Sequence, residues 1–178
     1  MSDIQPDRVS QPAEPWLRGT LTEDDAVTRA VLHALELAGE DIARWCASLT
    51  DAEFNARPFG LPPLAFHLRH IARSLDRLLS YAEGTQLDAT QLTALRTELD
   101  SDATRDAVFA EFRAALHTSA ARIRAFSPHH YNAPRTVGRA ALPTTVGGLL
   151  VHCADHTQRH TGQAVTTAKL LTAMRAKQ

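Results

Sequence analysis

The sequence predicts an all-α protein: a four-helix bundle with a short extra helix and a long loop before the last helix. In four segments apolar residues recur every three or four positions, which is the period of an amphipathic helix. Start and stop signals for helices stand at the ends of these segments. The length of 178 residues suits a single domain, and four such helices bury their apolar faces by packing together.

The beginning of the chain differs from the rest. Residues 1–15 contain three prolines and scattered charges without periodicity, which predicts a loose N-terminal arm. A single domain is expected over residues 16–178. Its first helix is expected over residues 22–49, with Thr22 as the N-cap. The apolar face of this helix consists of Val27, Val31, Leu35, Ala38, Ile42 and Trp45.

The second long helix is expected over residues 63–83. Proline suits its first turn, and Gly84 suits its end. Its apolar stripe consists of Leu64, Leu68, Ile71, Leu75, Leu78 and Ala82. The side chains expected on the opposite side are Arg69, Arg73 and Asp76. Because the seventeen arginines of the chain are dispersed among acidic residues, they predict a solvated surface rather than a phosphate site.

The middle of the chain is expected to hold a short helix and a third long helix. The short helix, over residues 90–98, lies inside a connection in which leucines are interspersed with polar residues. Helical spacing of apolar residues resumes at Val108 and continues to Phe126. Proline disfavours a helical residue before it, so the third long helix is expected to end at Ser127 and Pro128.

A long loop over residues 129–143 is expected before the last helix. It contains three residues that interrupt helices, Pro134, Gly138 and Pro143. The pattern allows a short strand pair across residues 137–138. Thr144 or Thr145 is the expected N-cap of the last helix, which extends to about Met174.

Composition excludes several classes of protein. Nineteen basic and twenty acidic residues give a net charge of -1, so the chain lacks the basic surface expected of a nucleic-acid-binding protein. No apolar run is long enough for a membrane span, and the N-terminal segment lacks the apolar core of a signal peptide. These features predict a cytoplasmic protein. Cys46 and Cys153 lie far apart in apolar patterns, which predicts reduced, buried thiols rather than a disulfide or a zinc ribbon.

Histidine is the unusual residue, with nine copies against two lysines. His152, His156 and His160 follow one another at intervals of four in the last helix, near the apolar face that carries Leu149 and Cys153. They are therefore expected to face the core. Burying several imidazoles in a row requires compensation that apolar packing does not offer, and a shared cation would supply it.

Geometry limits which histidines can share one ion. His152 and His160 are separated by about 12 Å along a helix, whereas a metal holds each nitrogen at about 2.0–2.1 Å. The last helix therefore offers His156 with either of these neighbours, and a third ligand must come from another helix. The second helix offers His67 and His70. Relative to its apolar stripe, His67 projects at about 40° and His70 at about 100°, so the projection favours His67.

Two segments of the chain resemble the DinB/YfiT-like family of metalloenzymes. They are Phe66-His67-Leu68-Arg69-His70-Ile71-Ala72, followed by Leu75-Asp76-Arg77-Leu78-Leu79, and Asp155-His156-Thr157-Gln158-Arg159-His160-Thr161-Gly162-Gln163. The resemblance implies a four-helix bundle, commonly dimeric, in which one histidine of the second helix and an H-x-x-x-H pair of the fourth helix bind a metal.

The resemblance also implies the ligand set. Matched by position, the helix-two ligand is His70, directly before Ile71-Ala72, and the helix-four pair is His156 and His160. His67 is kept as the substitute for His70. His67, His152 and Gln163 are the candidates for supporting a ligand or lining a pocket, and an ordinary core histidine is the favoured interpretation of His67 and of His152. The further candidates for pocket lining are Asp76, Tyr81 and Tyr131.

An ion held by three imidazoles keeps an open position, which is typical of a catalytic rather than a structural site. Nitrogen ligands favour a divalent ion, zinc or nickel in our interpretation. The open position suits either hydrolysis by an activated water or the orientation of a substrate thiolate for transfer. The family resemblance implies the second route, because its members include low-molecular-weight thiol S-transferases and a thiol-dependent isomerase.

We therefore expect a metal-dependent transferase or hydrolase that acts on a small-molecule substrate, such as a low-molecular-weight thiol, and that forms a homodimer without nucleic-acid or membrane partners. The chain lacks an H-E-x-x-H motif, and Asp155 projects about 100° around the helix from His156, so the motifs offer no general base. The alternative is a non-catalytic bundle that binds a metal or small ligand and serves as a dimeric interaction module.

Overall fold

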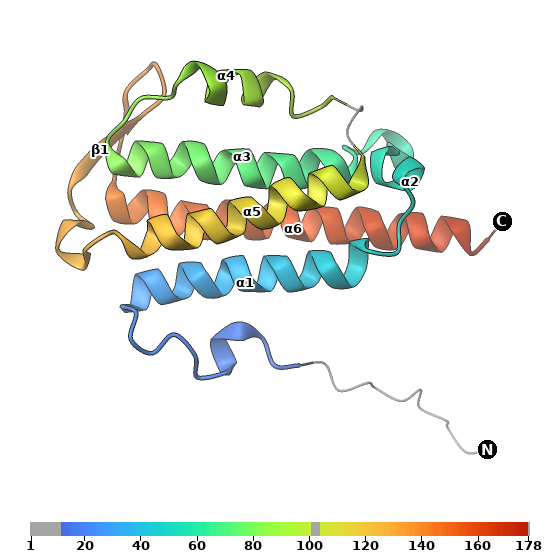
Figure 1. The fold of residues 1–178 in the computed structure, drawn as a ribbon, viewed down its shortest axis with the longest axis horizontal. Helices are drawn as coiled ribbons and strands as arrows, with labels where there is room; N and C mark the ends of the chain where they lie inside the picture. The colour runs from blue at the N-terminus through green and yellow to red at the C-terminus, as the bar shows by residue number, and fades with distance from the viewer. Residues whose placement is uncertain (1–11, 101–103, 178) are drawn as a thin grey trace.

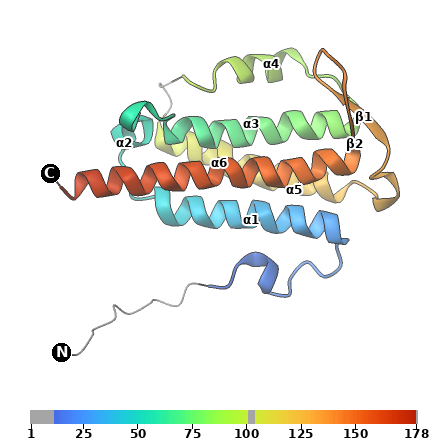
Figure 2. The ribbon, with the colours of Figure 1, turned by 180° about the vertical axis from the view of Figure 1, so that it is seen from behind.

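The computed structural model describes residues 12–100 and 104–177. Four long helices pack side by side, which confirms the predicted all-α bundle (Figure 1). They are α1 (Ala26–Cys46), α3 (Leu64–Glu83), α5 (Arg105–Arg124) and α6 (Val146–Arg175). Helix α6 packs against both α1 and α3, and α5 closes the bundle on the side away from α6 (Figure 2).

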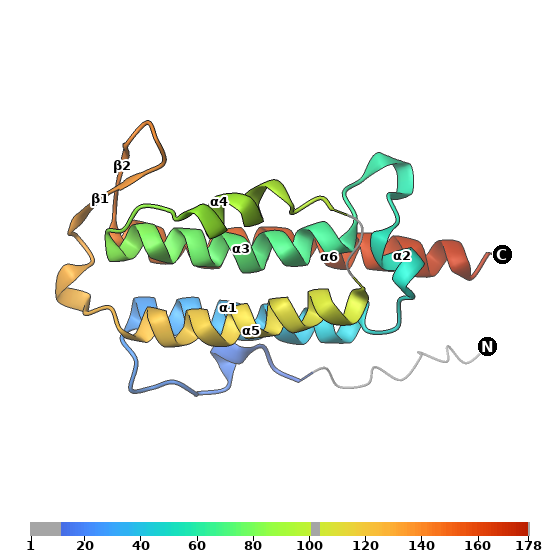
Figure 3. The same cartoon turned by 45° about the horizontal axis from the view of Figure 1, so that its top comes forward.

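The direction of the helices depends on a crossover connection. In Figure 1, α3 and α5 run in the same direction, whereas α1 and α6 run in the opposite one. The chain between α3 and α5 must therefore return along the bundle before α5 begins. This connection, whose described residues are 84–100, is called the strap and lies outside α3 (Figure 3). It contains α4 (Ala89–Arg96), close to the short helix predicted over residues 90–98.

Apolar side chains from all four long helices fill the core. Each long helix contributes from the stripe that its sequence period predicts. The largest fully buried side chains of these helices are Val31, Ile42, Leu64, Leu68, Ile71, Leu75, Leu79, Phe112, Ile123 and Leu150. Between them, Cys46 and Cys153 are completely buried and free, as predicted. The thiols therefore act as packing groups.

The beginning of the first helix differs from its prediction. The predicted N-cap Thr22 is wrong, because α1 begins at Ala26 and Asp25 is its N-cap. The Asp25 carboxylate accepts hydrogen bonds from the backbone N–H groups of Val27 at 2.9 Å and Thr28 at 3.2 Å. Its second oxygen accepts a hydrogen bond from Tyr131 Oη at 2.7 Å. This tertiary contact favours the later start.

The end of the first helix also differs, because α1 ends at Cys46 rather than Leu49. A short helix, α2 (Asp51–Asn55), follows, and the sequence analysis missed it. Its signal was present, since Thr50 and Glu53 form a capping box in which each side chain bonds the backbone of the other. The 3-10 helix η2 (Pro58–Gly60) then leads into α3.

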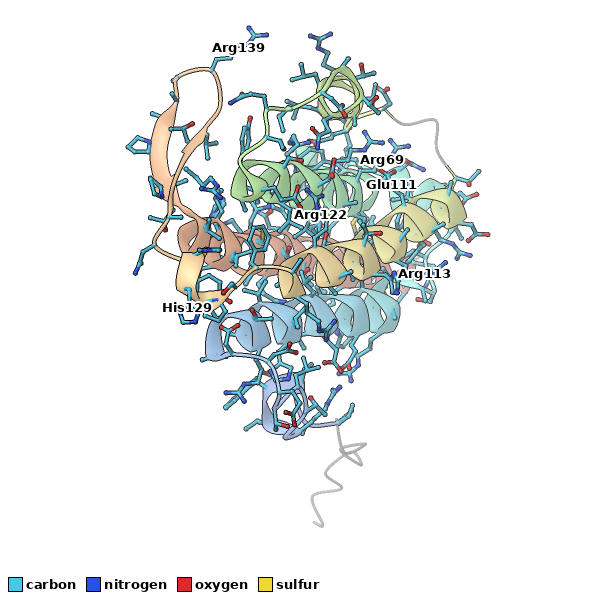
Figure 4. All side chains as sticks on the ribbon, turned by 60° about the vertical axis from the view of Figure 1, so that its left-hand side comes forward. Arg69, Glu111, Arg113, Arg122, His129 and Arg139 are labelled. Carbon is cyan, nitrogen blue, oxygen red and sulfur yellow. The ribbon has the colours of Figure 1, made fainter. Side chains whose placement is uncertain are left out.

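α5 ends at Arg124, three residues before the predicted end at Ser127, whereas other boundaries agree with the sequence signals. Gly84 ends α3 in the left-handed conformation, and Thr145 is the N-cap of α6. The predicted strand pair is present as an antiparallel hairpin of β1 (Pro134–Val137) and β2 (Leu142–Thr145). A 3-10 helix, η3 (Pro128–His130), follows α5. Figure 4 shows His129 in η3 and Arg139 at the tip of the hairpin, at the same end of the bundle.

The predicted N-terminal arm lies mostly outside the described residues, because residues 1–11 are not part of them. The 3-10 helix η1 (Pro15–Leu17) packs against α1 and buries Pro15. Just after η1, the guanidinium of Arg18 donates to Glu40 at 2.7 Å, which ties the segment to α1. Among the helices in the described ranges, none is long and apolar enough to cross a membrane.

The start of α1 at Asp25 leads to a testable difference between two neighbouring residues. We expect Asp25→Ala to lower the free energy of unfolding by about 1 kcal/mol, because the first turn of α1 loses its cap. Thr22→Ala is the matched control, since Thr22 is exposed and precedes the helix, and its effect should stay within about 0.5 kcal/mol. Urea denaturation measures both. Equal losses in the two variants would contradict the observed helix start.

Candidate metal centre

Three histidines from two helices converge where α3 packs against α6. His70 comes from α3, and His156 and His160 lie on successive turns of α6. The distance between ring centroids is 4.8 Å for His70 and His156, 4.4 Å for His70 and His160, and 4.7 Å for His156 and His160. The three rings thus surround one point at nearly equal separations.

The nitrogen atoms of these rings have the spacing of metal ligands. One nitrogen from each ring lies within 4.8 Å of the other two. The Nε2 atoms of His70 and His156 are 3.1 Å apart. Nitrogens held at about 2.0–2.1 Å from one ion are separated by about 2.8–3.4 Å for angles between 90° and tetrahedral. Small side-chain movements therefore suffice for all three rings to share an ion.

A buried glutamate contacts the far side of the His70 ring. The Nδ1 atom of His70 is 2.7 Å from Oε2 of Glu98, whose other oxygen accepts a hydrogen bond from Arg77 at 2.7 Å. Glu98 is only 5% exposed. The sequence analysis did not identify Glu98, because it lies in the connection between helices, where neither motif nor period marks it. Glu98 contacts His70 only because the strap runs alongside α3 in the folded protein.

The surroundings of His156, His160 and Glu98 lower the pKa values of all three side chains. Burial and then the neighbouring imidazoles lower the pKa of His156 and of His160 to about 4. Burial is also the largest influence on Glu98 and raises its pKa. Hydrogen bonds from His70 and Arg77 and the positive charge of Arg77 outweigh burial, so the pKa of Glu98 lies below its ordinary value. At neutral pH His156 and His160 therefore present lone pairs, which a cation can accept.

His67 lies beside the three-histidine group rather than in it. It is 3% exposed, and its Nδ1 atom is 3.2 Å from Nδ1 of His160. Burial and then the neighbouring His160 and His70 lower its pKa to about 4. The helical projection indicated correctly that His67 is the more buried of the two α3 histidines. The structure nevertheless groups His70 with the pair on α6, and places His67 against a member of that pair.

His152 does not face the core, contrary to the expectation for all three histidines of the last helix. Its side chain is 46% exposed and lies 3.6 Å from the carboxylate of Asp155. The reason is geometric: positions four residues apart on a helix are rotated by about 40°, so His152 lies about 80° away from His160. Its ring is still 5.5 Å from that of His156, measured between centroids.

A cavity of about 620 Å³ lies between the N-terminal half of α3 and α6, and His160 is the member of the three-histidine group that lines it. His67 and His160 line its inner side, and Phe66 stacks on the His70 ring at 5.2 Å between centroids. Gln163, a predicted pocket residue, also lines this cavity. The other pocket candidates lie elsewhere. Asp76 pairs with Arg122, and Tyr81 borders a separate cavity. Tyr131 donates a hydrogen bond to Asp25, the N-cap of α1.

Comparison with known protein families places the three histidines inside a matched segment. Residues 34–164, which include all three, match the DinB superfamily. The chain belongs to the DinB superfamily. No curated protein and no solved structure matches it. The resemblance seen in the two motifs is thereby confirmed, and the observed all-α bundle agrees with it.

In this DinB protein, the group suited to a metal consists of imidazoles. Within the described residues, the only set of three or more potential ligand side chains close enough to share an ion is His70, His156 and His160. Asp155 lies on the surface of α6 and pairs with Arg159 at 2.7 Å. Burial raises the pKa of the Cys153 thiol to about 12, so this cysteine stays protonated and is no nucleophile at neutral pH.

The lowered histidine pKa values predict how pH affects the metal-free protein. The unfolded chain takes up protons on His67, His156 and His160 near pH 6.5, whereas the folded protein does so only near pH 4. Between these values the unfolded state binds more protons, so we expect the free energy of unfolding to fall as pH is lowered from 6.5 to 4. Urea denaturation in the presence of a chelator measures this.

Carboxylates also take up protons near pH 4, so a histidine variant is needed to identify the histidine contribution to the pH dependence of the free energy of unfolding. His67→Gln removes one of the three groups and should make the free energy of unfolding less dependent on pH than in the parent protein. His152→Gln is the control, since its side chain is exposed. The same pH dependence in His67→Gln as in the parent would show that His67 takes up protons equally in both states.

Proposed function

We propose that this protein is a metal-dependent enzyme that acts on a small-molecule substrate at a centre formed by His70, His156 and His160. The observation that carries the proposal is the convergence of three imidazoles from α3 and α6 beside a cavity of about 620 Å³. Three protein ligands leave a coordination position free, which is the arrangement of catalytic rather than structural zinc sites. The cavity gives a substrate access to that side of the group.

The chemistry of the donors fits a divalent ion. Neutral imidazoles suit zinc, nickel, copper and ferrous iron, and the absence of a thiolate or carboxylate from the group among the described residues argues against ions that prefer those ligands. We propose zinc or nickel. When bound, such an ion supplies a Lewis acid that can activate a water or hold a substrate thiolate.

The residues around the group have separate tasks in this proposal. Glu98 and Arg77 fix the orientation of His70 from behind, and His67 contacts His160 from the side of the cavity. Phe66 covers the His70 ring with its apolar face and excludes water from it. Gln163, on the cavity wall, is placed to hydrogen-bond a polar group of the substrate.

The type of reaction that we propose depends on the nucleophiles available near the three-histidine group. Cys153 is buried and protonated, and the exposed carboxylate of Asp155 is paired with Arg159 at 2.7 Å. In the part of the chain that the structure describes, the three-histidine group therefore includes no nucleophile of its own. A substrate that brings its own nucleophile suits such a site, which favours transfer from a low-molecular-weight thiol over hydrolysis by a base-activated water.

Metal content gives the direct test of the centre. We expect protein purified without a histidine tag to retain about one divalent ion per chain, as three imidazole ligands imply. His156→Ala should weaken binding by more than the roughly 10–100-fold that loss of an outer-shell partner costs, because a ligand itself is removed. Elemental analysis and competition with a chelator measure both quantities.

The matched control is His152→Ala, which removes an exposed histidine one turn earlier on α6. It should leave the metal content unchanged. Equal metal content in the parent protein and in His156→Ala would contradict the proposed ligand set, and a parent protein that takes up no divalent ion would remove the metal centre altogether.

Turnover separates an enzyme from a binding module. The metal-loaded protein is expected to consume a low-molecular-weight thiol together with an electrophilic acceptor, and His160→Ala should abolish that consumption. Mass spectrometry of the products measures it, with His152→Ala as the active control. Tight metal binding without turnover of any thiol or ester would instead favour the non-catalytic bundle.

A further inference from the structure

The strap between α3 and α5 is attached by polar contacts to one face of α3. None of the residues of α4 is buried, so apolar packing does little to hold the strap in place. Three arginines spaced by four on α3 bind it instead. Arg69 donates to the backbone carbonyl of Asp100, Arg73 to that of Ala94, and Arg77 to the carboxylate of Glu98.

This arrangement overturns one expectation from the sequence. Arg69 and Arg73 were expected to project into solvent, but Arg69 is only 6% exposed and Arg73 is half-buried. The strap covers the face of α3 that the apolar stripe leaves polar. Arg73 also pairs with Glu111 of α5 at 2.7 Å, beside the strap.

Glu98 is the residue through which the strap contacts the metal centre. Each oxygen of its carboxylate has one partner: Oε1 is 2.7 Å from Arg77, and Oε2 is 2.7 Å from Nδ1 of His70. Because Arg77 pairs with Glu98 in a largely buried setting, the carboxylate is held as an anion. A carboxylate accepts hydrogen bonds and donates none, so the His70 Nδ1 atom must carry the proton.

The position of this proton also determines the state of Nε2, the other nitrogen of the His70 ring. A neutral imidazole carries one N–H, so a proton on Nδ1 leaves a lone pair on Nε2. That atom lies 3.1 Å from Nε2 of His156 and so faces the point that the three rings surround. The His70 ring therefore stands between Glu98 and the ion position, and Glu98 acts on the ion only through His70.

We propose that Glu98 is a positioning residue of the metal centre: anchored by Arg77 on the strap, it fixes His70 as the Nδ1–H tautomer and presents Nε2 to the ion. The inference rests on the proposed metal centre for its consequence, but the tautomer itself is a property of the metal-free protein. Carboxylates behind ligating imidazoles orient the ring and raise its basicity, and their loss weakens metal binding by about 10–100-fold.

The test uses two substitutions of Glu98 and a matched control on the same network. Glu98→Ala removes the acceptor, whereas Glu98→Gln keeps an oxygen that can accept from Nδ1–H. Glu111→Gln is the control, because it weakens the neighbouring pair with Arg73 and does not touch His70. Circular dichroism and urea denaturation establish that each variant folds.

Two measurements are made on each protein. Nitrogen-15 NMR of the histidine rings in metal-free protein reports which nitrogen of His70 carries the proton, and competition with a chelator gives the zinc and nickel dissociation constants. We expect Nδ1–H in the parent and in Glu111→Gln, and a loss of this preference in Glu98→Ala. Metal affinity should fall by about 10–100-fold in Glu98→Ala, less in Glu98→Gln, and remain at the parent value in Glu111→Gln.

The outcomes separate this inference from the proposed function. A proton on Nε2 of His70 in the parent protein would overturn the inference, and so would unchanged tautomer and affinity in Glu98→Ala. An equal loss of affinity in Glu111→Gln would overturn it as well, because the strap as a whole would then be responsible. A parent protein with the Nδ1–H tautomer and no affinity for either ion would contradict the metal centre, while supporting the role of Glu98 in orienting His70.

Discussion

The packing of α3 against α6 is the constraint on which the rest of the site depends. Ile71 and Leu75 of α3 and Cys153 and Ala164 of α6 are fully or almost fully buried in the core that contains this interface. This apolar contact sets the separation and relative rotation of the two helices. The histidines beside it are thereby brought together, and burial and the neighbouring imidazoles oppose the protonation of His156 and His160. The core stabilises the fold, and the site occupies its edge.

The bundle could be predicted from the sequence because its signals are local. The apolar period marked the four long helices, and Gly84 and Thr145 marked helix ends that the structure confirms. The start of α1 could not be predicted in the same way. Thr22 and Asp25 are both suitable caps, and the contact of Asp25 with Tyr131, which is distant in the sequence, favours the second. Helix boundaries that depend on such tertiary contacts leave no local trace.

Much of the three-histidine group could likewise be predicted from the sequence, and the exceptions have identifiable causes. The spacing of His156 and His160 on one helix requires no knowledge of the fold, and the family motif selected His70 where the helical projection favoured His67. The expectation for His152 failed because a helix rotates about 40° over four residues, which carries successive histidines off one face. Glu98 was missed because its contact with His70 depends on the path of the strap, which shows no strong period of its own.

The strap separates the stability of the fold from the geometry of the site. It contributes few buried apolar side chains, so its attachment adds little to the hydrophobic free energy that maintains the bundle. It nevertheless supplies the only carboxylate that contacts a histidine of the three-histidine group, within the described residues, through Glu98. The arginines spaced along α3 fix this segment by directional hydrogen bonds, which specify position more than they add stability. Changes in the strap should therefore alter the orientation of His70 well before they unfold the protein, because the core and this orientation depend on different interactions.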